Sequence, residues 1–186
     1  MLQHILYQRE FPETGQHFHL AHHAQTRLVV MTSNRALHVI RCGPAARAAN
    51  DTSWSMGWQV IEDPDPGTKL RAVVVHSKTG DIYVCNRGQH VVWVYTCVDR
   101  SYQHVRSIDK RPYQFYYPCS LALDEQSDTL FVSHFVGVSA FQCNHGTFLW
   151  LITHTGNQPY VTLGDLFVLR HGGDGDQPAR LVVCCG

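Results

Sequence analysis

The sequence predicts an all-β protein: a β-propeller, or an open propeller arc of four-stranded antiparallel blades. Short runs of β-branched and aromatic residues alternate with turns containing glycine, asparagine or aspartate, which is typical of antiparallel strands. These runs recur at intervals of about 50 positions, which lies in the range of propeller repeats. No stretch of useful length has the apolar spacing of an amphipathic helix.

The clearest unit lies in the middle of the chain, at residues 73–95. It opens on three consecutive valines, and such a continuous apolar run is expected for a strand that is buried on both faces. Gly80 follows, and it can adopt the positive φ that a tight reversal needs. The second strand, a polar loop and the third strand are expected at residues 82–84, 86–90 and 91–95.

Weaker copies of this unit lie on both sides of it, in a single domain, 1–186. Leu28, Leu130 and Leu181 are matched with Ile82 of the clear unit. Each copy then repeats the same order of short apolar runs, as expected for successive blades. The units are expected at approximately residues 16–61, 70–109, 118–153 and 161–186, the last of them incomplete.

Each complete unit is expected to carry a fourth strand at its outer edge. These outer strands are predicted at residues 54–61, 104–108 and 148–152. The Asp-Pro-Asp-Pro-Gly segment at 63–67 predicts a rigid turn between the first two units, because its prolines fix φ and remove backbone donors.

The segment from Gly80 to Tyr95, GDIYVCNRGQHVVWVY, resembles an NHL repeat, whose pattern here is roughly G-N-I-Y-V-A-D-T-G-N-H-R-I-Q-V-F. The chain departs from this pattern at two linked positions, where the usual aspartate is Asn86 and the usual arginine is Val91. Because those two side chains normally form an ion pair, replacing both together leaves no unpaired charge. The match is weaker in the other units, and it covers about half of the chain.

The resemblance implies a β-propeller, usually with six blades. It does not imply one function, because NHL-like propellers occur in ubiquitin ligases, RNA-binding translational regulators, receptor ectodomains and a peptide-amidating lyase. Six blades at this period would need roughly 300 residues, so the 186 residues are expected to be a piece of a longer propeller. An open arc and an unusually small ring are the alternatives.

Composition limits the partners and the compartment. The chain has 15 lysines and arginines and 15 aspartates and glutamates, so no overall positive charge draws it to nucleic acid or to an anionic membrane. Its seven cysteines include no C-x-x-C pair and are expected to be reduced thiols. We find no signal peptide and no apolar run near the ~18 residues of a membrane span. The expected location is therefore cytoplasmic, without a membrane partner.

Polar loops at one rim are the first candidate site, for a protein partner. Loops on a rigid scaffold are where binding residues usually lie. The candidates come from the loop after residue 84 and from the matching loop of the next unit: Asn86, Arg87, Gln89, His90 and His134. The alternative is that these residues form ordinary solvated turns.

An RNA site is the second candidate. Cations and aromatic residues interleave between positions 100 and 117, and this combination holds single-stranded RNA by stacking and phosphate pairing. The candidates are Arg100, Arg106, Lys110, Arg111 and Tyr113. The alternative is that the aromatic residues pack between blades.

A metal site is the third candidate. His22, His76 and Asp124 stand at the end of the first strand in successive units, where equivalent side chains of a propeller converge on its channel. A metal held there would polarise the substrate of a lyase or hydrolase. The alternative is that strand ends are polar because they meet water.

The leading hypothesis is a non-catalytic module that acts as a scaffold or adaptor for a protein partner. RNA binding and metal-dependent lyase or hydrolase activity are the alternatives. The sequence has no P-loop, no dinucleotide-binding glycine pattern and no G-x-S-x-G elbow, so no cofactor is expected.

Overall fold

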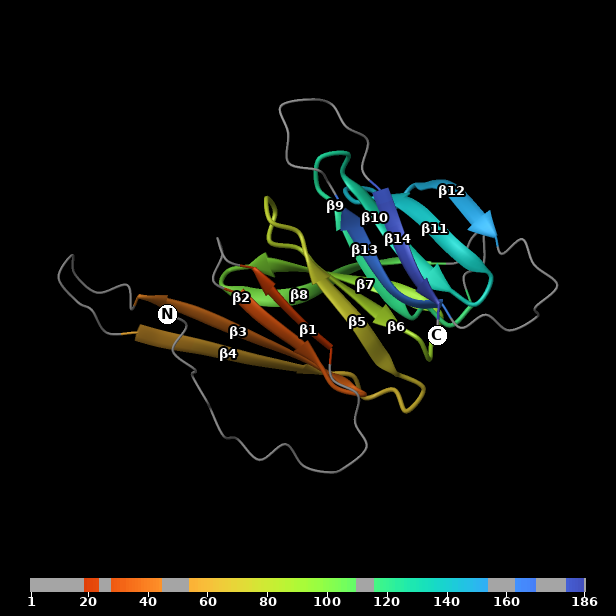
Figure 1. The fold of residues 1–186 in the computed structure, drawn as a ribbon. Coiled ribbons are helices and arrows are strands. Elements are labelled where there is room, and N and C mark those ends of the chain that lie inside the picture. Colours follow the sequence, from red (N-terminus) through yellow and green to blue (C-terminus); the bar gives the residue numbers. More distant parts are fainter. Residues whose placement is uncertain are drawn as a thin grey trace.

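The computed structural model of the chain describes residues 19–23, 28–44, 54–109, 116–153, 163–169 and 180–185. These residues form three four-stranded antiparallel sheets and one two-stranded sheet (Figure 1). In every sheet, strands that follow one another in the chain are hydrogen-bonded neighbours, so each sheet is a meander. The four-stranded antiparallel units predicted from the sequence are therefore present.

The first sheet contains β1 (His19–His23), β2 (Leu28–Thr32), β3 (Ala36–Pro44) and β4 (Trp54–Glu62). The second contains β5 (Leu70–Val75), β6 (Ile82–Asn86), β7 (Val91–Val98) and β8 (Ser101–Ile108). The third contains β9 (Ser120–Asp124), β10 (Thr129–His134), β11 (Gly137–Gln142) and β12 (Phe148–Thr153). The fourth is the pair β13 (Leu163–Leu169) and β14 (Arg180–Cys185).

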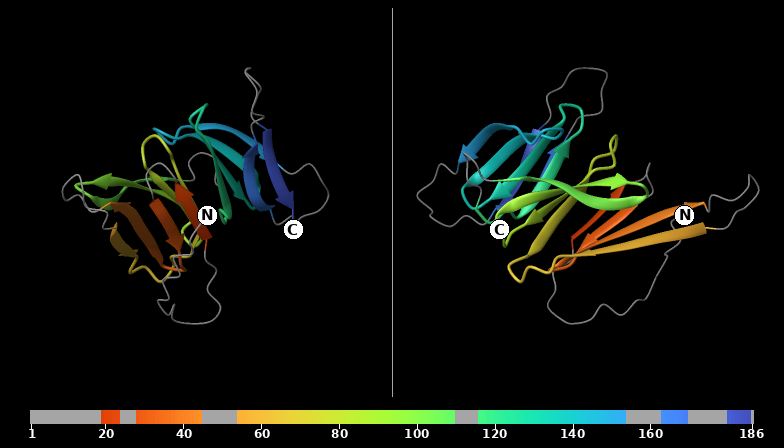
Figure 2. Two further views of the ribbon diagram at one scale, coloured as in Figure 1. Left: turned by 60° about the vertical axis from the view of Figure 1, so that its left-hand side comes forward. Right: turned by 180° about the vertical axis from the view of Figure 1, so that it is seen from behind.

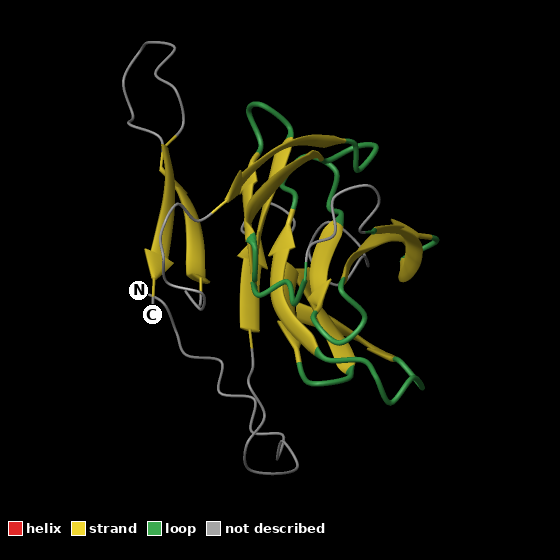
Figure 3. Cartoon of the chain, turned by 90° about the vertical axis from the view of Figure 1, so that its right-hand side faces the viewer, coloured by secondary structure: helices red, strands yellow, loops and turns green. Residues whose placement is uncertain are grey.

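The sheets follow one another in chain order and pack side by side, each against its neighbours (Figure 2). Their first strands, β1, β5, β9 and β13, contact one another in succession. The described residues are strands and loops only (Figure 3), and none of them forms a helix that could cross a membrane. This fan of antiparallel sheets is an arc of propeller blades, as the sequence predicts.

The turns form where the sequence provides suitable residues. Gly80 has φ 76°, and its amide donates to the carbonyl oxygen of His76 at 2.9 Å, which closes the turn between β5 and β6. Between β7 and β8, Asp99 and Arg100 both have positive φ, at 48° and 69°. A two-residue loop with this geometry matches the twist of the flanking strands. Strand β8 accordingly begins at Ser101, before the predicted outer strand.

Three apolar interfaces hold the sheets together. The second strand of the second sheet, β6, is buried along its whole length because its two faces serve two different interfaces. Ile82 and Val84 pack against the first sheet, whereas Tyr83 and Cys85 pack against the third. Burial on both faces explains why β6 reads as a continuous apolar run in the sequence.

The match between Leu28 and Ile82 that was made from the sequence is wrong by a single position. Ile82 and Leu130 both pack toward the preceding sheet, but Leu28 packs toward the following one. Side chains alternate between the two faces of a strand, so a shift of one residue reverses the face. Leu28 is therefore not the structural equivalent of Ile82, although both lie at the start of a second strand.

Candidate functional site

The loop at residues 87–90, between β6 and β7, is shaped by the buried side chain of Asn86. Its Oδ1 accepts hydrogen bonds from the amides of Lys69 and Gln89, both at 3.2 Å. Its Nδ2 donates to the hydroxyl oxygen of Thr68 at 3.4 Å. Asn86 is fully buried, so the structure assigns it to bracing this loop and not to contact with a partner.

On one side of this loop, Arg87 and His90 meet two tyrosines from the connection that leads into β9. The guanidinium carbon of Arg87 lies 5.6 Å from the ring centroid of Tyr117. The His90 ring packs edge-on against Tyr117 at 4.5 Å and against Tyr116 at 6.0 Å. The Tyr117 amide also donates to His90 Nδ1 at 3.0 Å. Two loops that are distant in sequence thus form one surface.

Phe135, in the turn between β10 and β11, extends this surface. Its amide donates to the carbonyl oxygen of Tyr116 at 2.8 Å. The exposed fractions of Tyr116, Tyr117 and Phe135 are 42%, 48% and 50%. We call these five residues the aromatic rim: Arg87, His90, Tyr116, Tyr117 and Phe135.

Sequence reasoning found the loop positions of the rim but not all of its members. Phe135 was missed, and the available signal was a large apolar residue in a loop that was otherwise expected to be polar. Its neighbour His134 was predicted to face a partner but is buried. The His134 Nε2 atom lies 2.9 Å from the Ser139 hydroxyl, and its Nδ1 accepts from the Val136 amide at 3.3 Å. His134 therefore shapes the turn that presents Phe135.

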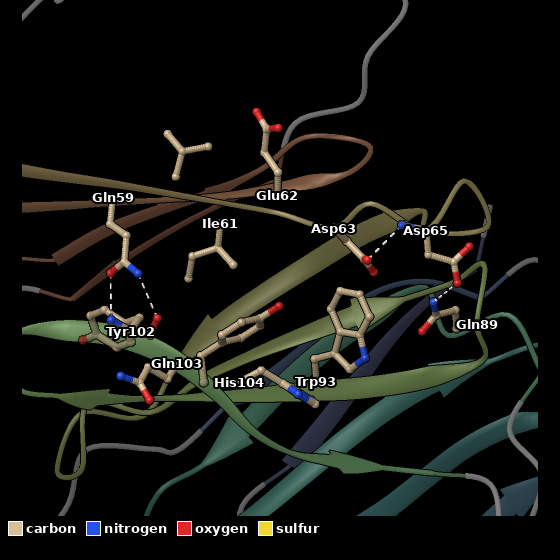
Figure 4. Close-up of a pocket in the computed structure, with 12 residues that line it drawn as sticks. Gln59, Ile61, Glu62, Asp63, Asp65, Gln89, Trp93, Tyr102, Gln103 and His104 are labelled. Atoms are coloured by element: carbon tan, nitrogen blue, oxygen red, sulfur yellow. Dashed lines mark hydrogen bonds between the residues drawn. The ribbon is translucent and has the colours of Figure 1, made fainter.

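On the other side of the same loop, Gln89 reaches toward the connection between β4 and β5. Its Nε2 donates to the carboxylate of Asp65 at 2.6 Å. Here a groove of about 760 Å³ runs between β4 and the β7–β8 hairpin (Figure 4). Gln59 spans its opposite end, with its side-chain amide bonded to the backbone of Tyr102.

The residues predicted to bind RNA do not gather on one free surface within the described chain. Arg100 is exposed in the turn before β8. Arg106 instead turns toward the third sheet, where its guanidinium donates to the carbonyl oxygen of Cys143 and lies 6.0 Å from the Tyr83 ring centroid. Lys110, Arg111 and Tyr113 lie outside the described residues.

The predicted metal ligands do not converge either. His22 is exposed on β1, whereas the Asp124 carboxylate accepts from the Gln126 amide at 3.2 Å and the Ser127 hydroxyl at 2.6 Å. Among the described residues, the group with metal-ligating potential joins His76 to Asp128 and Cys143, with the three donor atoms within 4.8 Å. Of the three predicted ligands, this group contains His76 but not His22 or Asp124.

The hydrogen bonds of His76 argue against a metal in that group. Its Nδ1 faces the amides of Lys78 at 3.2 Å and Thr79 at 3.4 Å, and both can only donate. The neutral ring must then carry its proton on Nε2, which points toward Asp128 Oδ1 at 3.3 Å. A metal at Nε2 would need the opposite tautomer. We conclude that this cluster links the second and third sheets.

Cys143 completes this polar link as a thiol. Burial raises its pKa to about 12, and the neighbouring Asp128 carboxylate acts in the same direction. A protonated thiol is not a nucleophile at neutral pH. Nearby, the Glu125 carboxylate accepts hydrogen bonds from both the amide and the hydroxyl of Ser77, across the same interface.

Comparisons with known proteins agree with this architecture. No protein-family model and no curated protein sequence matches the chain. Dihydro-heme d1 dehydrogenase NirN, solved in complex with DHE, is similar in structure, with a TM-score of 0.54 and 17% identity over 89% of this chain and 32% of that one. The WD40 domain of SCAP from fission yeast has a TM-score of 0.53 and 13% identity over 83% of this chain and 36% of that one.

Both of these proteins are propellers, and the chain spans about a third of the length of each. Identities this low carry over the fold and not the activity. Together with the sheet topology, the comparisons show that the chain has the β-propeller architecture, and its described residues form three four-stranded sheets and one pair of strands.

Proposed function

We propose that the chain is a non-catalytic, NHL-like propeller segment that binds a protein partner through the aromatic rim. The observation that carries the proposal is that three half-exposed aromatic residues lie close to Arg87. Tyr117 contacts Arg87, both tyrosines pack on His90, and the Phe135 amide is bonded to the Tyr116 carbonyl oxygen. Tyrosine and arginine are enriched among the residues that contribute most to protein–protein binding energy. An exposed aromatic cluster on a rigid scaffold is also a typical interaction surface.

Charge favours a protein over RNA as the partner. Arg87 is the rim's one arginine or lysine, and the whole chain has a formal charge of zero. RNA binding by stacking usually also needs a positive groove that follows the phosphates. Tyr117 with Arg87 above it is nevertheless a geometry on which a base can stack, so RNA is a defined outcome of the test.

The NHL assignment is supported by the pairing of β6 with β7. Asn86 and Val91, the two positions at which the chain departs from the NHL pattern, are cross-strand partners. Directly opposed side chains interact, so these positions are expected to change together. A lyase or hydrolase function lacks comparable support, because the described part of the chain does not bring its predicted ligands together.

We also propose a cytoplasmic location. Four cysteines whose side chains the structure describes, Cys85, Cys97, Cys119 and Cys143, are free thiols. Reduced thiols are the usual state in a cytosolic protein. Mass spectrometry of the protein from its native cells, after alkylation without reductant, tests this assignment.

Site-specific photocrosslinking tests the rim. A benzophenone amino acid at Phe135 places the probe inside the rim, and the same probe at Phe167 on β13 is the control, since that side chain is equally exposed at 51%. We expect a protein adduct at position 135 that is lost in the Tyr117→Ala variant and is absent at position 167. A nuclease-sensitive adduct would instead support RNA. Equal adducts at both positions would overturn the rim as a specific site.

A further inference from the structure

The aromatic rim lies next to a second arginine, Arg71 on β5, which is not one of its five members. We propose that Arg71 and Arg87 together bind a carboxylate, so that the segment recognised by the rim is an acidic peptide with apolar side chains beside its acidic residue. This inference rests on the proposed function, because it names the chemistry of the partner that the rim binds. We call the two arginines the carboxylate clamp.

The strand register places Arg71 on the face of the second sheet that packs toward the third. Leu70 packs toward the first sheet, and successive side chains of a strand alternate between its faces, so Arg71 points the other way. Ala72 also packs toward the third sheet, and Val73 packs toward the first again. The ladder between β5 and β6 accordingly shifts its register between Leu70 and Val73. Such a bulge re-aims a side chain, here that of Arg71.

Arg87 lies on the same face of the sheet, on the neighbouring strand. It follows two residues after Cys85, which packs toward the third sheet. Its amide donates to the carbonyl oxygen of Lys69 at 2.8 Å, which places it beside the start of β5. Its guanidinium carbon lies 5.6 Å from the ring centroid of Tyr117. Arg71 and Arg87 thus both face the connection that leads into β9.

The electrostatics of Cys119, in that connection, agree with this placement. The Cys119 Sγ atom donates to the carbonyl oxygen of Tyr117 at 3.0 Å. Burial raises the pKa of the Cys119 thiol, whereas the positive charges of Arg87 and Arg71 both lower it. A charge acts in this way only from nearby, so both guanidinium groups lie close to one point.

The charge at this point is not neutralised within the described part of the chain. Arg71 and Arg87 are both partly exposed. Among the described residues, neither guanidinium has a carboxylate partner or a hydrogen-bond acceptor. The segments that surround them, 87–90, 116–119 and 135–136, contain no aspartate or glutamate. The clamp therefore attracts an anion from outside.

The surroundings of the clamp favour a carboxylate on a peptide. An arginine that stacks on a tyrosine by its flat face keeps its N–H edge for an anion, and guanidinium groups bind carboxylates through charge-assisted, often bidentate hydrogen bonds. The half-exposed rings of Tyr116, Tyr117 and Phe135 suit apolar side chains beside the acidic residue. RNA would instead need cations spaced along its phosphates, whereas the clamp is a single cationic point.

Two peptides that differ in one charge test the clamp: acetyl-Ser-Phe-Glu-Phe-Ser-amide, and the same peptide with glutamine in place of glutamate. In NMR titrations of the full chain, we expect the glutamate peptide to bind about two- to fivefold more tightly, as for a partly exposed charge pair. The Nε–H resonances of Arg71 and Arg87, assigned with the two Arg→Gln variants, should shift with the glutamate peptide only. Arg71→Gln should remove most of the preference and leave the affinity for the glutamine peptide unchanged. Arg71→Lys, which keeps the charge, should retain part of the preference.

Two control variants separate the clamp from general effects. Arg100→Gln removes the same charge from the turn at the other end of β7 and should leave the preference unchanged. Phe135→Ala should weaken the binding of both peptides alike, because it shortens the apolar part of the rim. Equal losses of preference in Arg71→Gln and Arg100→Gln would show general charge attraction and overturn the clamp.

The remaining outcomes are equally defined. Equal affinity for the two peptides, or no binding of either at millimolar concentration, would overturn the clamp. Tighter binding of hexauridylate than of the glutamate peptide, lost in Arg71→Gln, would overturn the acidic peptide in favour of RNA. A protein adduct at position 135 would still support the rim after any of the first three results, so failure of the clamp and failure of the rim are distinguishable.

Discussion

Gly88, in the loop between β6 and β7, lies directly against the backbone of Gly67. A β-carbon at Gly88 would be 1.7 Å from the carbonyl oxygen of Gly67, far inside any possible contact. We predict that Gly88→Ala lowers the free energy of unfolding by about 2 kcal/mol or more, because backbone must move on one side. Gly57→Ala is the control, since its β-carbon would have the Arg41 β-carbon as nearest neighbour at 3.9 Å. Urea denaturation of both variants measures the difference, and equal effects would contradict this view of the loop.

A double-mutant cycle at Asn86 and Val91 tests whether the chain is of the NHL type. Asn86→Asp alone places a carboxylate at a fully buried position and should destabilise the fold by about 1–3 kcal/mol. Adding Val91→Arg on the opposite strand supplies the family's usual partner and should recover part of that loss. Chemical denaturation of both single variants and the double variant gives the coupling energy. Strict additivity would count against NHL-type pairing at these positions.

We predict that the folded protein loses stability at alkaline pH because of Tyr95. Burial raises its pKa to about 12, and the negative charge of Asp63 adds to this effect. The unfolded chain loses the phenol proton above about pH 10, whereas the folded chain keeps it. The free energy of unfolding should therefore fall as pH rises from about 10 to 12, by about 2 kcal/mol in all, and Tyr95 should contribute no slope below pH 9.

Tyr95→Phe removes this titration and should flatten that part of the pH profile. Guanidinium denaturation of both proteins at several pH values between 8 and about 11.5 measures it. The variant and the wild type should agree in slope at pH 8. Parallel profiles throughout the alkaline range would show that Tyr95 is not responsible.

The cysteines are expected to differ sharply in reactivity. Cys97 is exposed, whereas Cys85 and Cys143 are buried. Burial also raises the pKa of Cys85, and that of Cys143 to about 12, so neither forms the reactive thiolate at neutral pH. Peptide mapping after iodoacetamide treatment at pH 8 should find Cys97 modified before Cys85 and Cys143. Cys85 and Cys143 should react only in denaturant, and rapid labelling of Cys143 in the folded protein would contradict the structure of the link between the sheets.

The sequence predicted the strands well because their signals are local. The valines at 73–75 and the turn at Gly80 need no distant partner to be recognised. The assignment of faces failed at Leu28, because a match of apolar letters does not distinguish the two faces of a strand. Only the contact with the next sheet settles which face is which.

The sites were harder to predict because they join distant segments. Arg87 and His90 were assigned to a rim, but the tyrosines that pack on them come from another loop. His134 resembled a surface residue because nothing local reveals that Ser139 lies beside its ring. The same holds for His76, whose partner Asp128 lies in the next sheet. Whether a polar residue at a strand end is exposed or buried thus depends on how the sheets pack against one another.

Among the described residues, each sheet packs mainly against the sheets before and after it in the chain, and the pair β13–β14 packs against the third sheet. In such a linear array, the free energy of local opening depends on how many neighbours a unit has. Amide hydrogens of β13 and β14 should therefore exchange with deuterium by opening of that pair alone, ahead of those in β6 and β10. Protection would rise toward the second and third sheets, which makes the middle of the chain its last part to unfold.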